Sequence, residues 1–257
     1  MIWTLTRRGR WYLGAAAAVL VLLAVWHSLV PAPPAEEEYR ATLAAAPGPL
    51  RPIYSAKTTE KEAALTFDIS WGEKMAPKVL DVLRTYNLKA TFFLSGPWAK
   101  RHPELVARIV ADGHEIQSHG QEHVNFSGLS REQVAANVEA AHAILQEMTG
   151  QKPSYIRPPN GDFDQKSLAA TRDVGYQTVI WSVDSRDWMN PGVDAIIRYV
   201  TGKAHPGAII LMHASDSCKQ TDQALPAVID GMKAKGYKLV LMSDLMRHGV
   251  DPNGRIW

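Results

Sequence analysis

The sequence predicts an α/β barrel of parallel strands, with fewer than the usual eight strand–helix repeats, behind an N-terminal transmembrane helix. From residue 61 onward, short apolar runs alternate with segments of helical period, which indicates a parallel sheet. Ionisable residues stand at or just after the ends of several of these runs. Functional groups of such folds gather at the carboxyl ends of the strands, and a barrel brings those ends around one mouth, whereas an open sheet spreads them along a line. The pattern therefore favours a barrel.

Composition indicates one sizeable domain with an appendage. The chain has 257 residues and a formal net charge of +2, which leaves room for a large core and gives no reason to expect nucleic acid as a partner. Its single cysteine, Cys218, excludes an intramolecular disulfide. The domain must therefore depend on its core for stability.

The first 30 residues predict a membrane anchor. Residues 11–30 contain no Lys, Arg, Asp or Glu over 20 positions, which is long enough to cross a bilayer as a helix. Residues 1–10 carry three arginines, a basic tail that should stay in the cytoplasm. The alternative is a cleavable signal peptide, whose apolar region is usually shorter, about 7–15 residues. In both cases we expect the domain to lie outside the cytoplasm, and with the anchor retained the protein is a single-pass protein of the cell membrane.

Residues 31–60 predict a stalk. They are rich in Pro, Ala and Glu without a sustained period, and their prolines would break any helix placed over them. The folded domain is expected over residues 61–249, followed by a short tail at 250–257.

Seven apolar runs predict the strands of the domain, and helices lie between them. The helix over residues 130–148 is the clearest, because Ser130 and Gln133 form a capping box and Gly150 follows as a stop signal. The runs are 63–67, 90–94, 115–118, 155–157, 178–183, 208–212 and 238–242.

His119 and His123 predict a metal site after the run at 115–118. Three residues separate them, which places two imidazoles within reach of one ion, on a helical turn or a tight loop. A catalytic zinc site usually has three protein ligands and one open position. Asp68, which follows the run at 63–67, is the candidate for the third ligand or for a general base. The alternative is a pair of surface histidines in a loop.

Two further strand ends carry residues suited to acid–base chemistry. Arg157 can hold a carboxylate in place and keep it ionised, although a structural ion pair is an equal alternative. The loop after it turns at two prolines and a glycine, so that a backbone N–H near Asn160 could stabilise an oxyanion. His213 can act as a general acid with Asp187 as the carboxylate that tunes it, or it can be a buried hydrogen-bonded histidine.

Trp188 is the remaining candidate at these strand ends. Its flat apolar face is of the kind that lines ligand grooves, although packing in the core is the commoner fate of tryptophan.

Taken together, these residues resemble the polysaccharide deacetylase family, also called the NodB homology domain or carbohydrate esterase family 4. The resemblance covers about residues 63–246, and five ordered motifs are more specific than any one of them. In chain order, the motifs are Thr66-Phe67-Asp68, His119 to His123, Arg157 to Gly161, Asp184 to Trp188, and Leu211 to His213.

The resemblance implies a distorted (β/α)7-type barrel, narrower than a TIM barrel, and metal-assisted removal of acetyl groups from an N-acetylated sugar. It implies that Asp68 is the base, that His119 and His123 bind the metal, and that His213 is the acid. Arg157 would orient Asp68 and Asp187 would tune His213. The residues expected to contact the substrate are Pro159, Asn160, Trp188 and Leu211. The expected metal is zinc, with cobalt, nickel or manganese as alternatives.

The chain is most similar to the sporulation-associated PdaB-like branch of the family, in the stretches 66–72, 157–163 and 213–217 and in its short membrane-anchored layout. This similarity implies a peptidoglycan substrate in the cell wall or spore envelope.

One departure from the family pattern leaves the outcome open. The first motif usually has a second aspartate that binds metal, and here that position is Ile69, which cannot be a ligand. Asp68 could take over as a ligand, or Asp216, Cys218 or water could complete the shell. The alternative function is a glycan-binding wall protein with a weakened catalytic site, and a passive scaffold is the third reading.

Overall fold

The computed structural model describes residues 49–248. The predicted cytoplasmic tail, transmembrane helix and C-terminal tail, and most of the predicted stalk, lie outside the described residues. Within residues 49–248, no helix is long and apolar enough to cross a membrane.

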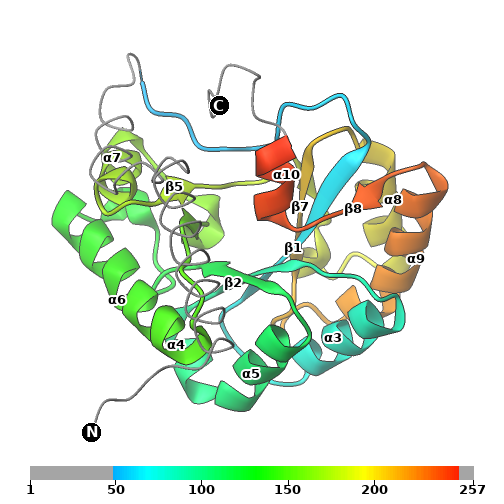
Figure 1. Ribbon diagram of the computed structural model, residues 1–257, viewed down its shortest axis with the longest axis horizontal. Coiled ribbons are helices and arrows are strands. Elements are labelled where there is room, and N and C mark those ends of the chain that lie inside the picture. Colours follow the sequence, from blue (N-terminus) through cyan, green and yellow to red (C-terminus); the bar gives the residue numbers. More distant parts are fainter. Residues whose placement is uncertain (1–48, 249–257) are drawn as a thin grey trace, which may run out of the picture. The chain divides into compact units, whose positions relative to one another are not determined.

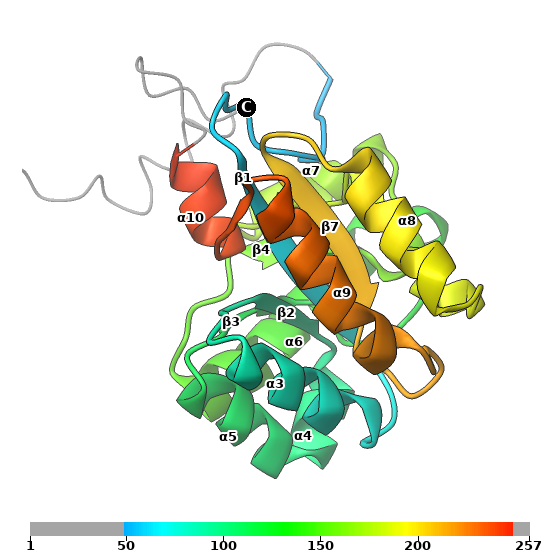
Figure 2. The same ribbon diagram turned by 90° about the vertical axis from the view of Figure 1, so that its right-hand side faces the viewer.

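The described part is built around one parallel sheet of eight short strands, in the order β5-β4-β3-β2-β1-β7-β6, with β8 paired to the start of β1. The sheet curls into a half-barrel, and helices flank it on its outer side (Figures 1 and 2). The strands are β1 (Glu62–Ile69), β2 (Thr91–Leu94), β3 (Glu115–Ser118), β4 (Tyr155–Ile156), β5 (Gln177–Thr178), β6 (Val183–Asp184), β7 (Ala208–His213) and β8 (Lys238–Leu239).

The helices follow the strands along the chain, as expected for a strand–helix repeat. The α-helices are α3 (Met75–Thr85), α4 (Gly96–Arg101), α5 (Pro103–Ala111), α6 (Arg131–Thr149), α7 (Gln165–Asp173), α8 (Val193–Lys203), α9 (Thr221–Ala234) and α10 (Met242–His248). Three 3₁₀ turns, η1 (Phe126–Gly128), η2 (Pro159–Gly161) and η3 (Asp187–Met189), lie in the loops.

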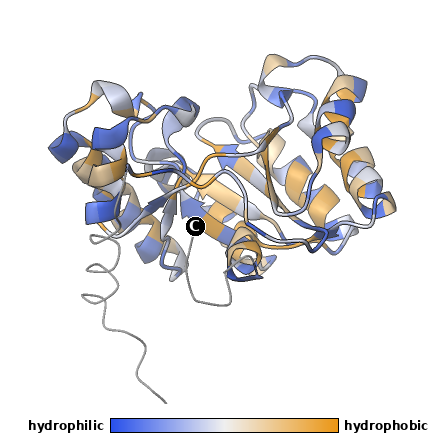
Figure 3. Ribbon diagram, turned by 90° about the horizontal axis from the view of Figure 1, so that it is seen from above, coloured by the Kyte–Doolittle hydropathy of each residue, from blue (hydrophilic) through white to orange (hydrophobic). Residues whose placement is uncertain are grey.

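Side-chain alternation along β1 separates two hydrophobic clusters. Leu65, Phe67 and Ile69 point outward and are buried in a large cluster with the apolar faces of α3, α5, α8 and α9. Ala64 points inward, into a smaller cluster that α10 closes with its own apolar residues. The central strands are hydrophobic, and the flanking helices carry both hydrophobic and hydrophilic residues (Figure 3). This alternation places Asp68 on the inner face of the sheet.

The best-defined predicted helix is confirmed. Helix α6 begins after Ser130, whose hydroxyl accepts from the backbone N–H of Gln133, while the Gln133 side chain accepts from the N–H of Ser130. It ends at Gly150, which has a φ of 67° and caps the helix in the left-handed conformation.

The run at 178–183 was predicted as one strand and is divided instead. Val179 donates its backbone N–H to the carbonyl of Ile156 in β4, whereas Ser182 donates its backbone N–H to the carbonyl of Ile209 in β7. These partners belong to opposite ends of the sheet order, so the segment between them has to bend. Two short strands, β5 and β6, result from one apolar run.

The run at 238–242 also differs from the prediction, because only its first two residues form a strand. The N–H of Met242 donates to the Thr91 hydroxyl at 2.9 Å, and the N–H of Ser243 donates to the buried Glu115 carboxylate at 3.2 Å. These interior side chains accept the first hydrogen bonds of α10, and the chain turns into a helix.

The last part of the predicted stalk belongs to the domain. Ile53 and Ala56 are buried, and Ile53 exchanges backbone hydrogen bonds with Thr178 and Ile180. The folded domain therefore begins before residue 61.

Candidate active site

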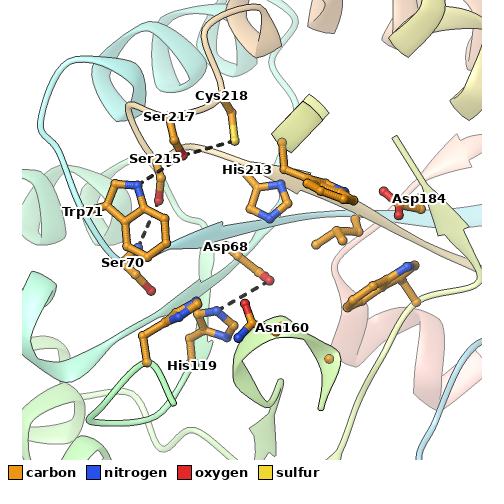
Figure 4. A pocket seen from close by; sticks show the side chains of 15 residues that line it. Asp68, Ser70, Trp71, His119, Asn160, Asp184, His213, Ser215, Ser217 and Cys218 are labelled. Carbon is orange, nitrogen blue, oxygen red and sulfur yellow. Dashed lines mark hydrogen bonds and ion pairs between the residues drawn. The ribbon is translucent and has the colours of Figure 1, made fainter. Parts of the chain in front are cut away.

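A cavity of about 430 Å³ opens at the carboxyl ends of β1, β3 and β7. This volume lies within the range of small-molecule sites, about 300–1,000 Å³. Asp68 and His213 are register partners on the adjacent strands β1 and β7, and both point into the cavity (Figure 4). The sequence-predicted residues that line it are Asp68, His119, His123, Asn160, Trp188, Leu211 and His213.

Asp68 is held by a fully buried arginine. Arg157 Nη1 donates to Asp68 Oδ1 at 2.7 Å, and Arg157 Nη2 donates to the carbonyl of Ile180 at 3.0 Å. The guanidinium lies 4.1 Å from the ring centroid of Phe93, which packs against its face. Burial disfavours the charged form of Asp68, but the positive charges of Arg157 and His213 outweigh it and lower the pKa of Asp68. Asp68 is therefore an oriented carboxylate at neutral pH.

The tautomer of His119 is fixed by the backbone. Its Nδ1 lies 2.7 Å from the carbonyl oxygen of Arg157, which can only accept, so Nδ1 carries the proton and Nε2 has a free lone pair. Burial lowers the pKa of His119 to about 4, so the ring is neutral at pH 7. A neutral imidazole whose second nitrogen is hydrogen-bonded is the usual state of a metal ligand.

The residues expected near a metal are neighbours in the structure. His119 Nε2 is 3.8 Å from Asp68 Oδ2, and the rings of His119 and His123 are 5.3 Å apart between centroids. Two atoms bound to one tetrahedral zinc at about 2.0–2.1 Å are themselves separated by about 3.4 Å. The separation between His119 and Asp68 is close to that value, and burial also lowers the pKa of His123. The neutral imidazoles of His119 and His123 suit a divalent metal, but in the described part of the chain these two residues and Asp68 do not bring three ligand atoms within 4.8 Å of one another.

Ile69 brings no ligand to this group. Its side chain is fully buried in the outer cluster, and it is not among the residues that line the cavity. Asp216, a predicted substitute, is committed elsewhere: its carboxylate accepts the backbone N–H groups of Glu73, Lys74 and Met75 at 2.8–3.2 Å, at the start of α3.

Cys218, the other predicted substitute, lines the cavity beside His213. Cys218, His213 and Asp187 each have one possible ligand atom, and these three atoms lie within 4.8 Å of one another. The Asp187 carboxylate already accepts three hydrogen bonds, two from His213 and one from Thr221, so it is not a free metal ligand.

His213 is held and tuned by a buried carboxylate. Its Nδ1 lies 2.7 Å from Asp187 Oδ1, and its backbone N–H donates to Asp187 Oδ2 at 2.7 Å. The Thr221 hydroxyl donates to the same Oδ2 at 2.8 Å. Burial disfavours the charged imidazole, but Asp187 outweighs it and raises the pKa of His213 well above its ordinary value. At neutral pH, His213 is a protonated acid facing Asp68.

Asn160 reaches the cavity from a strained turn. It has a φ of 58°, in the left-handed region that asparagine tolerates better than most residues, and its side chain donates to Asn125 Oδ1 at 2.8 Å. No group in the described part of the chain accepts its backbone N–H. Pro159 is buried at the start of this turn and does not line the cavity, so its predicted contact with a substrate stays a prediction.

The sequence prediction missed five residues that line the cavity. They lie mainly in the loops after β1 and β7, where the strand-end rule could have pointed to them. They are Ser70, Trp71, Trp181, Ser215 and Ser217.

The family model described as polysaccharide deacetylase matches residues 55–179. A peptidoglycan-N-acetylglucosamine deacetylase of Bacillus cereus is 35% identical over 198 residues, which covers 76% of this chain and 92% of the relative. The uncharacterized protein YlxY of Bacillus subtilis is 34% identical over 197 residues, and the match spans 76% of this chain but only 60% of that protein.

Solved structures give the same result. The crystal structure of a carbohydrate esterase family 4 pseudoenzyme from Bacillus anthracis has a TM-score of 0.72 at 33% identity, covering 76% of this chain and 68% of that one. A mutant of that pseudoenzyme with restored enzymatic activity matches equally well, with a TM-score of 0.72 at 34% identity. The expectation of a polysaccharide deacetylase is thereby confirmed, and the chain belongs to the polysaccharide deacetylase family, carbohydrate esterase family 4.

Proposed function

We propose that this protein removes N-acetyl groups from cell-wall glycan, with zinc or another divalent metal, from a domain anchored outside the cytoplasmic membrane. The observation that carries the proposal is the pairing of two opposite acid–base groups across one cavity. Asp68 is held ionised by Arg157, and His213 is held protonated by Asp187. Environments that separate the charge states of two titratable groups in this way are typical of acid–base catalysis.

The metal would be held by His119 and His123. When bound, it would supply a Lewis acid that polarises the amide carbonyl and lowers the pKa of a water molecule. Asp68 accepts the proton of the attacking water, and His213 gives its proton to the sugar nitrogen as the amide bond breaks. The backbone N–H of Asn160 donates to the developing oxyanion. Leu211 and Trp188 supply apolar contacts to the acetyl methyl group.

The substrate is proposed from the relatives. Because the matched Bacillus cereus protein is a peptidoglycan-N-acetylglucosamine deacetylase, an N-acetylated wall polymer is the substrate class that the similarity supports. The anchor is supported by the uncharged stretch at residues 11–30. The link to sporulation and to the PdaB-like branch stays a prediction.

The test compares release of acetate from N-acetylated peptidoglycan by the wild type and by Asp68→Asn. We expect at least a hundredfold loss of turnover in the variant, because general base catalysis typically contributes about 10²–10⁴-fold. Tyr54→Ala, an exposed aromatic residue away from the cavity, serves as the control. Circular dichroism verifies that each variant is folded. Unchanged turnover in Asp68→Asn would remove Asp68 as the base.

A second function is favoured by Ile69 and by the similarity to a pseudoenzyme. In that case the domain binds glycan without deacetylating it. Metal removal separates the two functions, because turnover depends on the metal whereas simple glycan binding does not. A wild-type protein that binds N-acetylated glycan equally well with and without a chelator, and releases no acetate with added zinc, cobalt, nickel or manganese, is a binding protein.

A further inference from the structure

Most of the exposed large apolar residues in the described part of the chain line the cavity or directly follow a residue that lines it. Among the described residues, five large hydrophobic side chains are exposed. Trp71 and Trp188 line the cavity, and Val124 and Met189 directly follow the lining residues His123 and Trp188. The fifth, Tyr54, lies elsewhere. Apolar surface concentrated around one opening is typical of a surface that receives a ligand.

Trp71 is exposed but rigidly placed. It is 45% exposed, and its indole Nε1–H donates to the hydroxyl of Ser217 at 3.1 Å. Its ring lies 5.0 Å from the ring of His123, at an interplanar angle of 72°. Figure 4 shows Trp71 at the edge of the cavity, with Ser217 beside its ring nitrogen. The indole is therefore fixed by its polar edge and by its neighbour, while much of its surface remains open to solvent.

The backbone around Trp71 is also tied on both sides. The N–H of Ser70 donates to the Ser215 hydroxyl at 3.1 Å, and the carbonyl of Trp71 accepts from the N–H of Asp216 at 3.3 Å. The carbonyl of Gly72 accepts from the indole of Trp98 at 2.7 Å. Two loops, one after β1 and one after β7, thus hold the ring before any ligand arrives. A ring that is already ordered loses little entropy on binding.

The cavity favours a neutral ligand. Among its lining residues, the charged or titratable side chains are Asp68, Asp184, three histidines and Cys218, and no Lys or Arg lines it. The one buried arginine beneath it is already paired with Asp68. The protonated His213 is already paired with Asp187, so apart from a bound metal a ligand with its own carboxylate would meet no unpaired cation among these residues, whereas an uncharged N-acetylated sugar would need none.

We propose that Trp71 is a substrate-binding residue whose indole stacks on the apolar face of an uncharged N-acetylhexosamine ring. That ring lies next to the sugar that reacts, on the His123 side of the cavity. The inference rests on the proposed function for its choice of ligand. It makes Trp71 a second aromatic contact beside Trp188, and it predicts that longer oligosaccharides bind more tightly than a single sugar. No step of the acid–base chemistry depends on Trp71.

Calorimetric titration with tetra-N-acetylchitotetraose tests this proposal. The full-length protein in detergent carries Asp68→Asn, so that binding is measured without turnover, and Trp71→Ala and Trp71→Phe are added to that background. Tyr54→Ala is the matched control, because Tyr54 is 46% exposed and outside the cavity. We expect about tenfold weaker binding for Trp71→Ala, equivalent to about 1.4 kcal/mol, a smaller loss for Trp71→Phe, and no change for Tyr54→Ala.

Two further measurements separate stacking from an indirect effect through His123. Zinc content is determined for every variant, and the titrations are repeated with monomeric N-acetylglucosamine. If Trp71 stacks on a neighbouring sugar, Trp71→Ala weakens tetramer binding and leaves zinc content and monomer binding unchanged. Loss of zinc together with equal losses for monomer and tetramer would make Trp71 a support for His123 and overturn the proposal.

The measured affinities and the release of acetate also decide between the proposals. Unchanged affinity in Trp71→Ala, or a parent protein that does not bind the tetramer, overturns the proposal. A wild-type protein that binds through Trp71 but releases no acetate would refute the proposed deacetylase activity and leave this inference standing.

Discussion

Removing the buried arginine tests the electrostatic account of the site most directly. Arg157 is fully buried, and its closest charged partner is Asp68, which is only 5% exposed. In Arg157→Met, the side chain keeps most of its apolar bulk but leaves the Asp68 carboxylate buried without its cation. Breaking a buried ion pair from one side costs about 3–5 kcal/mol. For a domain of this size, each kcal/mol lowers the melting temperature by about 2–4 °C, so the expected decrease is about 6–20 °C.

The control carries the same substitution at a solvent-exposed ion pair. Arg108 Nη2 lies 2.6 Å from Asp81 Oδ1, but the Asp81 side chain is 64% exposed. We expect Arg108→Met to cost at most about 1 kcal/mol. Urea denaturation monitored by circular dichroism gives the free energy of unfolding of each variant, with a chelator present so that metal binding does not contribute.

A double mutant supplies the decisive comparison. Asp68→Asn removes the charge that Arg157→Met leaves stranded, so the two changes together should cost less than the sum of their separate effects. The reasoning is refuted if Arg157→Met costs no more than Arg108→Met. It is equally refuted if the effects of Arg157→Met and Asp68→Asn are additive.

Three further predictions concern the acid and the loop that carries the tryptophan. Asp187 raises the pKa of His213, so the ion pair contributes stability that is present below pH 6.5 and is lost as pH rises through the raised pKa. The rate of acetate release should fall over the same pH range, because His213 loses the proton that it gives to the leaving nitrogen. Asp187→Asn should therefore move the alkaline limb of the pH–rate profile to lower pH; an unmoved limb would exclude His213 as the acid. Asp216→Ala removes the acceptor of three N–H groups at the start of α3 and should cost about 1–2 kcal/mol in urea denaturation, whereas no loss would mean that water replaces the cap. Gly72→Ala should destabilise the protein more than Gly150→Ala, although both glycines have positive φ. A Cβ at residue 72 would lie 2.2 Å from the Asp216 carboxyl carbon, whereas a Cβ at residue 150 would face open space. Equal melting temperatures of the two variants would contradict this steric account.

Periodicity and strand-end polarity were sufficient to predict that most of the candidate site residues lie together at one end of the sheet. Asp68, His119 and His213 stand where short buried runs end, and a curled parallel sheet necessarily brings such ends together. Local signals also predicted α6, because its capping residues and its stop glycine are adjacent to the helix in the sequence.

Features that depend on contacts distant in the chain were not predictable. The bend between β5 and β6 arises because one apolar run pairs with both β4 and β7, and the start of α10 depends on Thr91 and Glu115. Trp71 follows a β-strand in the sequence like many core tryptophans. Only the folded loops reveal that Ser217, 146 residues away in the chain, holds it at the surface.

Arg157 orients two groups of the site through two chemically different parts of itself. Its side chain binds Asp68, and its main-chain carbonyl fixes the tautomer of His119. A substitution at residue 157 removes the side-chain bond to Asp68 but keeps the main-chain acceptor for His119, since every amino acid has a backbone carbonyl. A variant at residue 157 can thus lose the orientation of Asp68 while His119 keeps the hydrogen bond that fixes its tautomer. Reversion to arginine would restore the interaction with Asp68 without any change at His119.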